Sequence, residues 1–441
     1  TDDDELFSTV YHKLVHSPAL TSLLQVENSY AAIVQDLIKQ RDKHLASLGK
    51  RQTDEMVRAI EGVNSSLTEA DVTALAGRHL EEHNMENAQW ESKLVGIHNE
   101  HKNEYKSWLM TLLVESCDSP ITTPKSSSVT MPNSSESDCN DMGDAQKLQE
   151  SFTIHLGSQL KQMYNIRILS SDPLDFCRLR TSPSGELAPQ PQRLQTALGL
   201  YSNDLCGIVL LTDNCLGSFS GVTKDFIKIC EASTELHFQS VENQFTKVRE
   251  SVEKGVEWRK HNPSPTDTHM LTMMEQQLRK NDTKYLQTGD VYLTKHSNLS
   301  EVHVVFHMVV DDSLQSNDIN SRHPAILGLR NIIKCACLND VTTLTVPVLL
   351  THELTDEMTM NWCTKRAELV YKCVKGFMIE MASWGGSELK NLQLLVPMGI
   401  SEEIFSALAT MLPSIFRVSN PLVLKANNSP QNSNKEKKER K

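Results

Sequence analysis

The first quarter of the chain repeats apolar residues at steps of three and four, the period of an amphipathic helix. Ser17 and Pro18 are typical of a helix start and Gly49 of a helix end, so we expect a first helix between them. A short second helix follows at 56–63. The sequence Ser-Leu-Thr-Glu at 66–69 has the pattern of a capping box and predicts the start of a third helix, which reaches about residue 115.

This third helix carries one apolar stripe with near-heptad spacing, formed by Val72, Leu75, His79, His83, Trp90, Leu94, Ile97, His101, Tyr105, Trp108 and Leu112. About 50 helical residues span roughly 75 Å, which is longer than a small domain is wide. Such a helix needs a partner along its stripe. The partner is either the preceding helices, folded back as a hairpin, or another protein. We therefore assign 1–115 to a helical hairpin or coiled-coil-like region.

Beyond residue 151, apolar and often β-branched runs alternate with helical stretches. The expected strands lie at 165–170, 206–211, 302–310, 344–350 and 392–396. The expected helices lie at 224–232, 238–258, 324–338, 363–382 and 402–412. This alternation predicts an α/β fold with a mixed or parallel sheet and flanking helices. We expect the domain to span 151–424, with an insertion near 238–280.

Composition separates two further segments from these folded parts. Residues 116–150 are rich in serine and proline and contain little to bury, which predicts a disordered linker. Residues 425–441 are rich in Asn, Ser and Lys and predict a disordered tail. The net charge of −12 disfavours direct RNA binding by this chain, because an acidic surface repels phosphates.

Several features of the sequence predict a soluble cytoplasmic protein. The ten cysteines are irregularly spaced and several lie in apolar runs, as reduced cysteines do. The first residues have neither the basic region nor the apolar core of a secretion signal. We find no apolar run as long as the ~18–20 residues that a membrane-spanning helix needs.

The segment 207–222 resembles the first phosphate loop of a macrodomain, in which a strand is followed by a glycine-rich loop and a helix. The runs at 288–294, 302–307, 324–338 and 344–347 follow in the order of that family. The resemblance implies a macrodomain-like fold. It aligns Asp172 with the acid that recognises adenine and Asn214 with the second asparagine of the loop. Gly217 and Gly221 would let the backbone approach a diphosphate closely.

The second phosphate loop departs from the macrodomain pattern. Residues 347–354 read Pro-Val-Leu-Leu-Thr-His-Glu-Leu, without the glycines of the family. Glu353 places a carboxylate where an anion would bind, and like charges at ~4 Å repel by about 1–4 kcal/mol. We therefore expect no cofactor and no catalytic residue. Asp172, Asn214, Gly217, Gly221 and Thr351 remain candidates for a vestigial pocket.

Four longer strings resemble the family of third subunits of FERRY, a five-subunit endosomal Rab-effector complex. They lie at 306–315, 321–331, 367–378 and 415–419. The resemblance implies a non-enzymatic subunit that reaches early endosomes through its complex. It further implies links to a Rab GTPase, messenger RNA and ribosomes through the complex, and to mast-cell degranulation.

Two histidine groups invite a second interpretation. His296, His303 and His307 could suggest a metal site, but their aliphatic surroundings favour buried core histidines, and we expect no metal. His79, His83 and His101 lie on the helical stripe, where they either set the choice of partner or lie at a solvated edge.

These features together predict a scaffold. We expect the helical stripe to offer an elongated surface to another subunit and the α/β domain to supply a rigid second surface. The alternative is a binding module or hydrolase for ADP-ribose or a related nucleotide.

Overall fold

The computed structural model describes residues 2–63, 65–118, 148–156, 162–179, 191–216, 219–261, 286–384 and 389–416. The predicted linker at 116–150 and the tail at 425–441 fall largely or wholly outside them, as does the end of the insertion predicted near 238–280. No helix in the described part of the chain is long and apolar enough to span a membrane.

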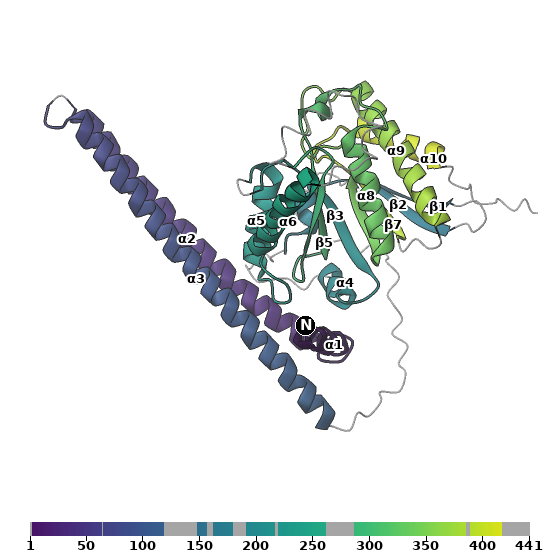
Figure 1. Ribbon diagram of the computed structural model, residues 1–441, viewed down its shortest axis with the longest axis horizontal. Coiled ribbons are helices and arrows are strands. Elements are labelled where there is room, and N and C mark those ends of the chain that lie inside the picture. Colours follow the sequence, from purple (N-terminus) through teal and green to yellow (C-terminus); the bar gives the residue numbers. More distant parts are fainter. Residues whose placement is uncertain are drawn as a thin grey trace, which may run out of the picture.

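Three helices form the N-terminal part: α1 (Asp2–Val15), α2 (Leu20–Glu61) and α3 (Glu69–Asp118). Helices α2 and α3 fold back on each other as an antiparallel hairpin (Figure 1). Helix α1 is not among the predicted helices, although Phe7, Val10, Tyr11 and Leu14 have helical spacing and are all buried.

Two predicted helix boundaries in this part are wrong. Gly49 does not end a helix, because α2 continues through it to Glu61. The capping box is formed by Thr68 and Asp71 rather than by residues 66–69. The Asp71 carboxylate accepts hydrogen bonds from the Thr68 amide at 2.9 Å and the Thr68 hydroxyl at 2.7 Å, and the Asp71 amide donates to that hydroxyl at 3.3 Å. The cap lies two residues later than predicted because Thr68, not Ser66, precedes the first helical residue.

The rest of the described chain is built around one seven-stranded mixed sheet, as the alternating pattern predicts. Its order is β1 (Gln149–Leu156), β2 (Gln162–Ser170), β7 (Asn391–Val396), β6 (Val341–Pro347), β3 (Leu205–Thr212), β5 (Val304–Val309) and β4 (Val291–Lys295). The five inner strands are parallel, and each edge strand is antiparallel to its neighbour. The edge strands β1 and β4 are not among the predicted strands.

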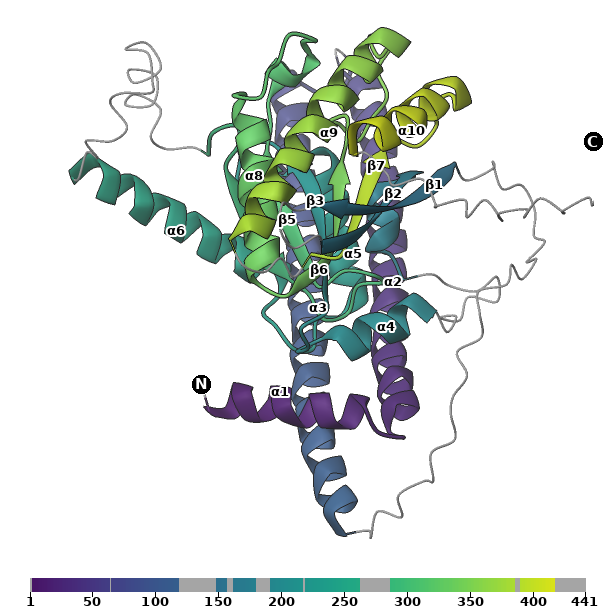
Figure 2. The same ribbon diagram turned by 90° about the vertical axis from the view of Figure 1, so that its right-hand side faces the viewer.

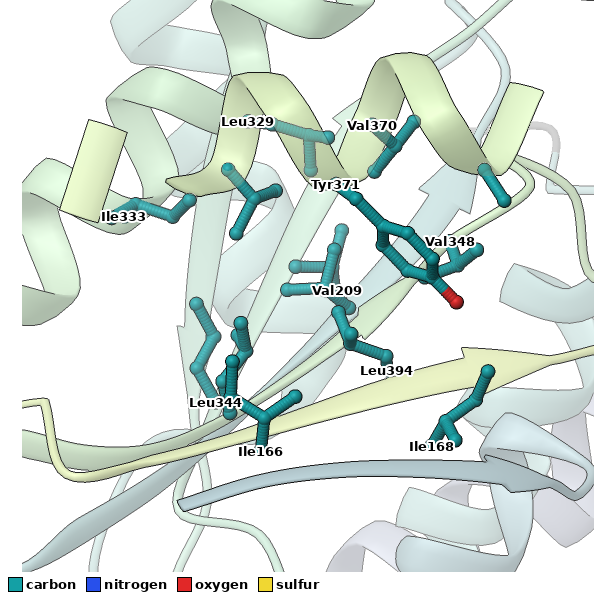
Figure 3. Packing of buried hydrophobic residues seen from close by; sticks show 14 of the residues in the cluster. Ile166, Ile168, Val209, Leu329, Ile333, Leu344, Val348, Val370, Tyr371 and Leu394 are labelled. Carbon is teal, nitrogen blue, oxygen red and sulfur yellow. The ribbon is translucent and has the colours of Figure 1, made fainter. Parts of the chain in front are cut away.

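Helices cover both faces of the sheet (Figures 1 and 2). On one face lie α8 (Pro324–Leu338), α9 (Met360–Ser383) and α10 (Glu402–Phe416). Their apolar sides pack on Ile166, Val209, Leu344 and Leu394 to form the main core (Figure 3). On the other face, α5 (Gly221–Ser233) and α6 (Val241–His261) contribute Phe226 and Phe245 to a second core.

The proximal part of the hairpin packs on the α/β domain through α1 and α4 (Pro191–Gly199). A separate apolar cluster fills this junction with Tyr11, Tyr105, Leu109, Leu200 and Leu236, all of them buried. Further along, α2 contacts α5, where Arg41 and Glu231 form an ion pair at 2.6 Å. The distal part of the hairpin projects beyond the α/β domain (Figure 1).

Candidate functional site

The position of the predicted phosphate pocket is the C-terminal edge of strands β3, β5 and β6, the edge at which α/β sheets bind ligands. A hollow of about 270 Å³ remains there, and its lining includes Leu211, Val222, Val310, Thr351 and Trp362. Residues Asp172, Asn214 and Gly221 are not part of this lining. Of the candidates that lie within the described residues, only Thr351 lines this hollow.

The second loop closes over the strand ends with its own side chains. Leu349 and Leu350 are buried, and Leu350 has a φ of 54°, a conformation that favours glycine. The Leu211 amide at the end of β3 donates a hydrogen bond to His352 Nε2 at 3.0 Å. Burial lowers the pKa of His352 to about 4, so the ring is neutral at pH 7. A backbone donor beside the expected anion site thus binds an imidazole instead.

Arg366, in the first turns of α9, holds the closed loop from the inside. Its guanidinium donates to the carbonyl oxygens of Leu349 at 3.0 Å, Leu314 at 2.6 Å and Ser316 at 2.8 Å. It also stacks over the Trp362 ring, 4.4 Å from the centroid. The side chain is 2% exposed. The buried guanidinium is hydrogen-bonded to backbone carbonyl oxygens. It therefore cannot pair with a phosphate that approaches from solvent.

The remaining candidate residues make local contacts. Asp172 caps the short 3-10 helix η1 (Pro173–Phe176) by accepting from the Leu174 amide at 3.0 Å, and its other oxygen pairs with Arg178 at 2.9 Å. Asn214 is exposed. Gly221 begins α5 with a φ of 54°.

The Thr351 hydroxyl exchanges hydrogen bonds with the Glu353 backbone at 3.0 and 3.3 Å. Gly217 lies outside the described residues. Asp172, the residue expected to recognise adenine, is already paired with Leu174 and Arg178 within the protein.

The helical stripe, the second candidate surface, is covered within the chain. Leu94, His101 and Tyr105 are buried against α2, and His101 stacks on Tyr30 at 4.2 Å. Of the two partners expected for this stripe, the structure shows the preceding helix, with α2 packed along α3 as a hairpin. His79 pairs with Glu55 across the hairpin at 2.9 Å, and His83 is exposed.

A buried polar network fixes the hairpin to the α/β domain. The Glu27 carboxylate of α2 accepts from the Tyr105 hydroxyl at 2.6 Å and from Arg193 Nη2 of α4 at 2.7 Å. Arg193 also donates to Asn298 Oδ1 at 2.6 Å, and the Asn298 amide donates to the carbonyl oxygens of Ser233 and Thr234. Because these partners come from segments far apart in the sequence, sequence reasoning did not identify them.

The three core histidines are buried, as predicted. The Thr294 hydroxyl joins His296 Nε2 at 2.7 Å and His307 Nε2 at 2.9 Å. His303 Nδ1 accepts a hydrogen bond from the Cys206 amide, and His303 Nε2 donates one to the Thr196 carbonyl oxygen. His307 Nδ1 has no hydrogen-bond partner in the described part of the chain.

The distal part of the hairpin remains as an exposed surface. Its two helices hold each other through Arg51 and Glu82 at 2.5 Å and His44 and Glu86 at 3.1 Å. Outside this seam, Leu80 and Met85 of α3 are 62% and 65% exposed.

Comparison with known proteins places the whole chain in one family. A family model described as Fy-3, Ferry endosomal RAB5 effector complex subunit 3, matches residues 1–422. The FERRY endosomal RAB5 effector complex subunit 3 of Rattus norvegicus is 43% identical over 436 residues, covering 96% of this chain and 77% of the rat protein. The Homo sapiens protein of that name is 42% identical over 435 residues with the same coverage. The chain belongs to the family of FERRY endosomal RAB5 effector complex subunit 3.

Proposed function

We propose that this chain is a non-enzymatic scaffold subunit of a Rab5 effector complex that assembles on early endosomes from the cytoplasm. The observation that carries the proposal is its 43% sequence identity, over 96% of its length, to a relative of that name. Through the complex, the chain would link a Rab GTPase to messenger RNA and ribosomes for transport. A contribution to mast-cell degranulation belongs to the same proposal.

The occupied hydrogen-bond donors at the predicted pocket support a role without catalysis. Catalysis on a phosphate ester needs donors aimed at a space that a substrate can enter. Here the donor at Leu211 is occupied by His352, and the guanidinium of Arg366 is bound to three carbonyl oxygens.

The way the two parts are joined supports a scaffold. The buried network of Glu27, Arg193 and Asn298 and the apolar junction cluster hold the hairpin at a fixed place on the α/β domain. A hairpin held in this way can present its distal part to a second protein at a defined distance from the sheet.

Co-expression of the full chain with the other four FERRY subunits tests the proposal. We expect the chain to co-elute with them on gel filtration. The double substitution Leu80→Glu with Met85→Glu should weaken co-elution, because it places two charges on the exposed apolar side chains of the distal hairpin. Asn84→Glu, on the same exposed stretch of α3, is the matched control and should co-elute normally. Elution of the wild-type chain apart from all four subunits would overturn the proposal.

A nucleotide-binding module is the second candidate, because a hollow of about 270 Å³ and the left-handed backbone at Leu350 persist at the pocket. Calorimetry with ADP-ribose distinguishes it. We expect no heat of binding from the wild-type chain. Micromolar binding that Asn214→Ala or Asp172→Ala abolishes would favour this candidate over the scaffold.

A further inference from the structure

A groove of about 1080 Å³ runs along the free edge of β4, away from the predicted pocket. One wall is β4 itself, with Val291, Leu293 and Lys295. The opposite wall is one side of α6, where Gln244, Val248 and Val252 follow each other at steps of four. Helices α1 and α3 line the third side with Asp4, Glu5, Lys102 and Lys106.

Among the described residues, no strand pairs with the outer edge of β4, whose backbone groups face this groove. In an antiparallel pair, alternate residues bond to the neighbouring strand and the residues between them turn outward. The Val309 amide donates to the Asp290 carbonyl oxygen and the His296 amide to the His303 carbonyl oxygen, so the even-numbered positions of β4 face β5. The N–H and C=O groups of Val291, Leu293 and Lys295 consequently point into the groove.

Of these three residues, Lys295 already has hydrogen-bond partners for both of its backbone groups, supplied by the Gln244 side chain. The Gln244 side-chain amide accepts from the Lys295 amide at 2.8 Å and donates to the Lys295 carbonyl oxygen at 2.8 Å. A primary amide bound in this way repeats the pair of bonds that a peptide group of a neighbouring strand would make. For the outward groups of Val291 and Leu293, the described part of the chain supplies no such partner.

The side chains around this edge suit a peptide that carries both apolar and acidic residues. Tyr292, Val248, Val252 and Leu286 form an apolar side. Lysines 102, 106, 247 and 295 line the groove together with Asp4, Glu5 and Asp290. Lys106 pairs with Asp4 at 3.5 Å, whereas Lys247 and Lys295 have no carboxylate partner in the described residues. In a chain of net charge −12, this local excess of lysine favours an acidic ligand.

We propose that the groove binds an extended segment of a partner polypeptide, which adds to the sheet as an antiparallel strand beside β4. Its backbone would bond to Val291 and Leu293, an apolar side chain would face Tyr292 and Val248, and an acidic side chain would lie near Lys247 and Lys295. An exposed sheet edge is a place at which proteins bind extended peptides by strand addition. This inference goes beyond the scaffold proposal and does not depend on it.

Leu293→Pro tests the hydrogen bonds of this edge selectively. Proline removes an N–H that points into the groove, and no bond between β4 and β5 uses that N–H. The Leu293 side chain is 43% exposed, so its loss costs little packing. Leu293→Ala keeps the N–H and is the matched control.

The probe is a peptide selected from a random display library on the immobilised full chain and then resynthesised with a fluorescent label. We expect Leu293→Pro to weaken its binding about tenfold, since one lost hydrogen bond and the steric effect of the ring together approach 1.4 kcal/mol. Leu293→Ala should change it less than threefold (a shift below about 0.7 kcal/mol). Lys247→Glu should weaken the binding of an acidic peptide, because it replaces a positive charge of the groove by a negative one. In the wild-type chain, the peptide should slow hydrogen exchange at the Val291 and Leu293 amides.

Equal binding to the proline and alanine variants overturns the proposal, as does a library that yields no peptide. If the proline variant fails to fold, the exchange measurement on the wild-type chain decides, and unchanged exchange at Val291 and Leu293 contradicts the inference. A peptide that binds only after residues 262–285 are deleted would identify the occupant as the chain's own segment rather than a partner.

Discussion

Arg366 joins the second loop, at Leu349, to the segment 314–316 through hydrogen bonds to their carbonyl oxygens. Three carbonyl oxygens accept from its guanidinium, and burial lowers its pKa to about 10, still well above neutral pH. Removing it leaves buried carbonyl groups without donors, and each unsatisfied buried group costs about 1–3 kcal/mol.

We therefore expect Arg366→Ala to lower the free energy of unfolding by about 3 kcal/mol or more. In a domain of this size that corresponds to a decrease in melting temperature of about 6–12 °C. Differential scanning calorimetry measures it. Arg322→Ala, at an exposed arginine, is the control and should shift the melting temperature by no more than about 2 °C. A similar small shift for Arg366→Ala would show that the loop does not depend on this side chain.

The buried histidines make stability depend on pH. Burial lowers the pKa of His296 and of His307 to about 3, and the neighbouring His296 adds to the effect on His307. In the unfolded chain both titrate near ~6.5. The unfolded state therefore binds more protons below pH ~6.5, and stability is lost as the pH falls from there towards 3.

Between pH 7.5 and 5.5 we expect each of these two histidines to reduce the free energy of unfolding by about 1.4 kcal/mol. His307→Leu should reduce the loss of unfolding free energy between these two pH values by about 1.4 kcal/mol. This difference does not depend on how the substitution changes stability at pH 7.5. Urea unfolding at the two pH values measures the difference. His83→Gln, at an exposed histidine, should leave the pH dependence unchanged. An unchanged pH dependence in His307→Leu would contradict the assignment.

Among the elements, the contact between α2 and α4 determines how the hairpin is held. Glu27 and Arg193 are 2% and 6% exposed, so removing one partner leaves the other charge buried and unpaired. Breaking such a buried pair typically costs about 3–5 kcal/mol, whereas replacing both partners by apolar residues is often close to neutral.

We expect Glu27→Leu or Arg193→Leu alone to speed hydrogen exchange in α1 and α4 strongly. The double variant should recover much of the protection. The half-buried pair of Arg41 and Glu231 gives the matched control, since Arg41→Ala should alter exchange in α1 and α4 only slightly. A double variant that exchanges faster than either single variant would show that the pair is favourable in itself, contrary to this account.

The sequence pattern predicted elements best where apolar periodicity and end signals agree. Helix α8 lies at the predicted residues because Pro324 opens it and its apolar side is continuous. The pattern failed at Gly49 because an interior glycine costs a helix only about 1 kcal/mol, and α2 continues through it to pack on α3. It also missed β1 and β4, because edge strands are short or polar and lack the apolar runs of strands buried on both faces.

At the scale of the whole molecule, the changed second loop was visible in the sequence, since residues 349–353 lack glycine. How that loop closes was not visible. His352 and Leu211 are 141 residues apart, and Arg193 and Glu27 are 166 residues apart, so their contacts follow from tertiary packing. The sequence also left open whether the stripe on α3 packs on the preceding helices or on another protein, and the structure packs it on α2.

The α/β domain holds a hairpin whose distal part, we propose, contacts another subunit. Lys43, Lys50 and Lys93 are exposed along that part of the hairpin. Cross-linking mass spectrometry of the complex purified from cells through a tag on this chain tests the claim most directly. We expect cross-links from these lysines to other FERRY subunits. Purification of the chain without any of those subunits, or cross-links confined to the chain itself, would contradict it.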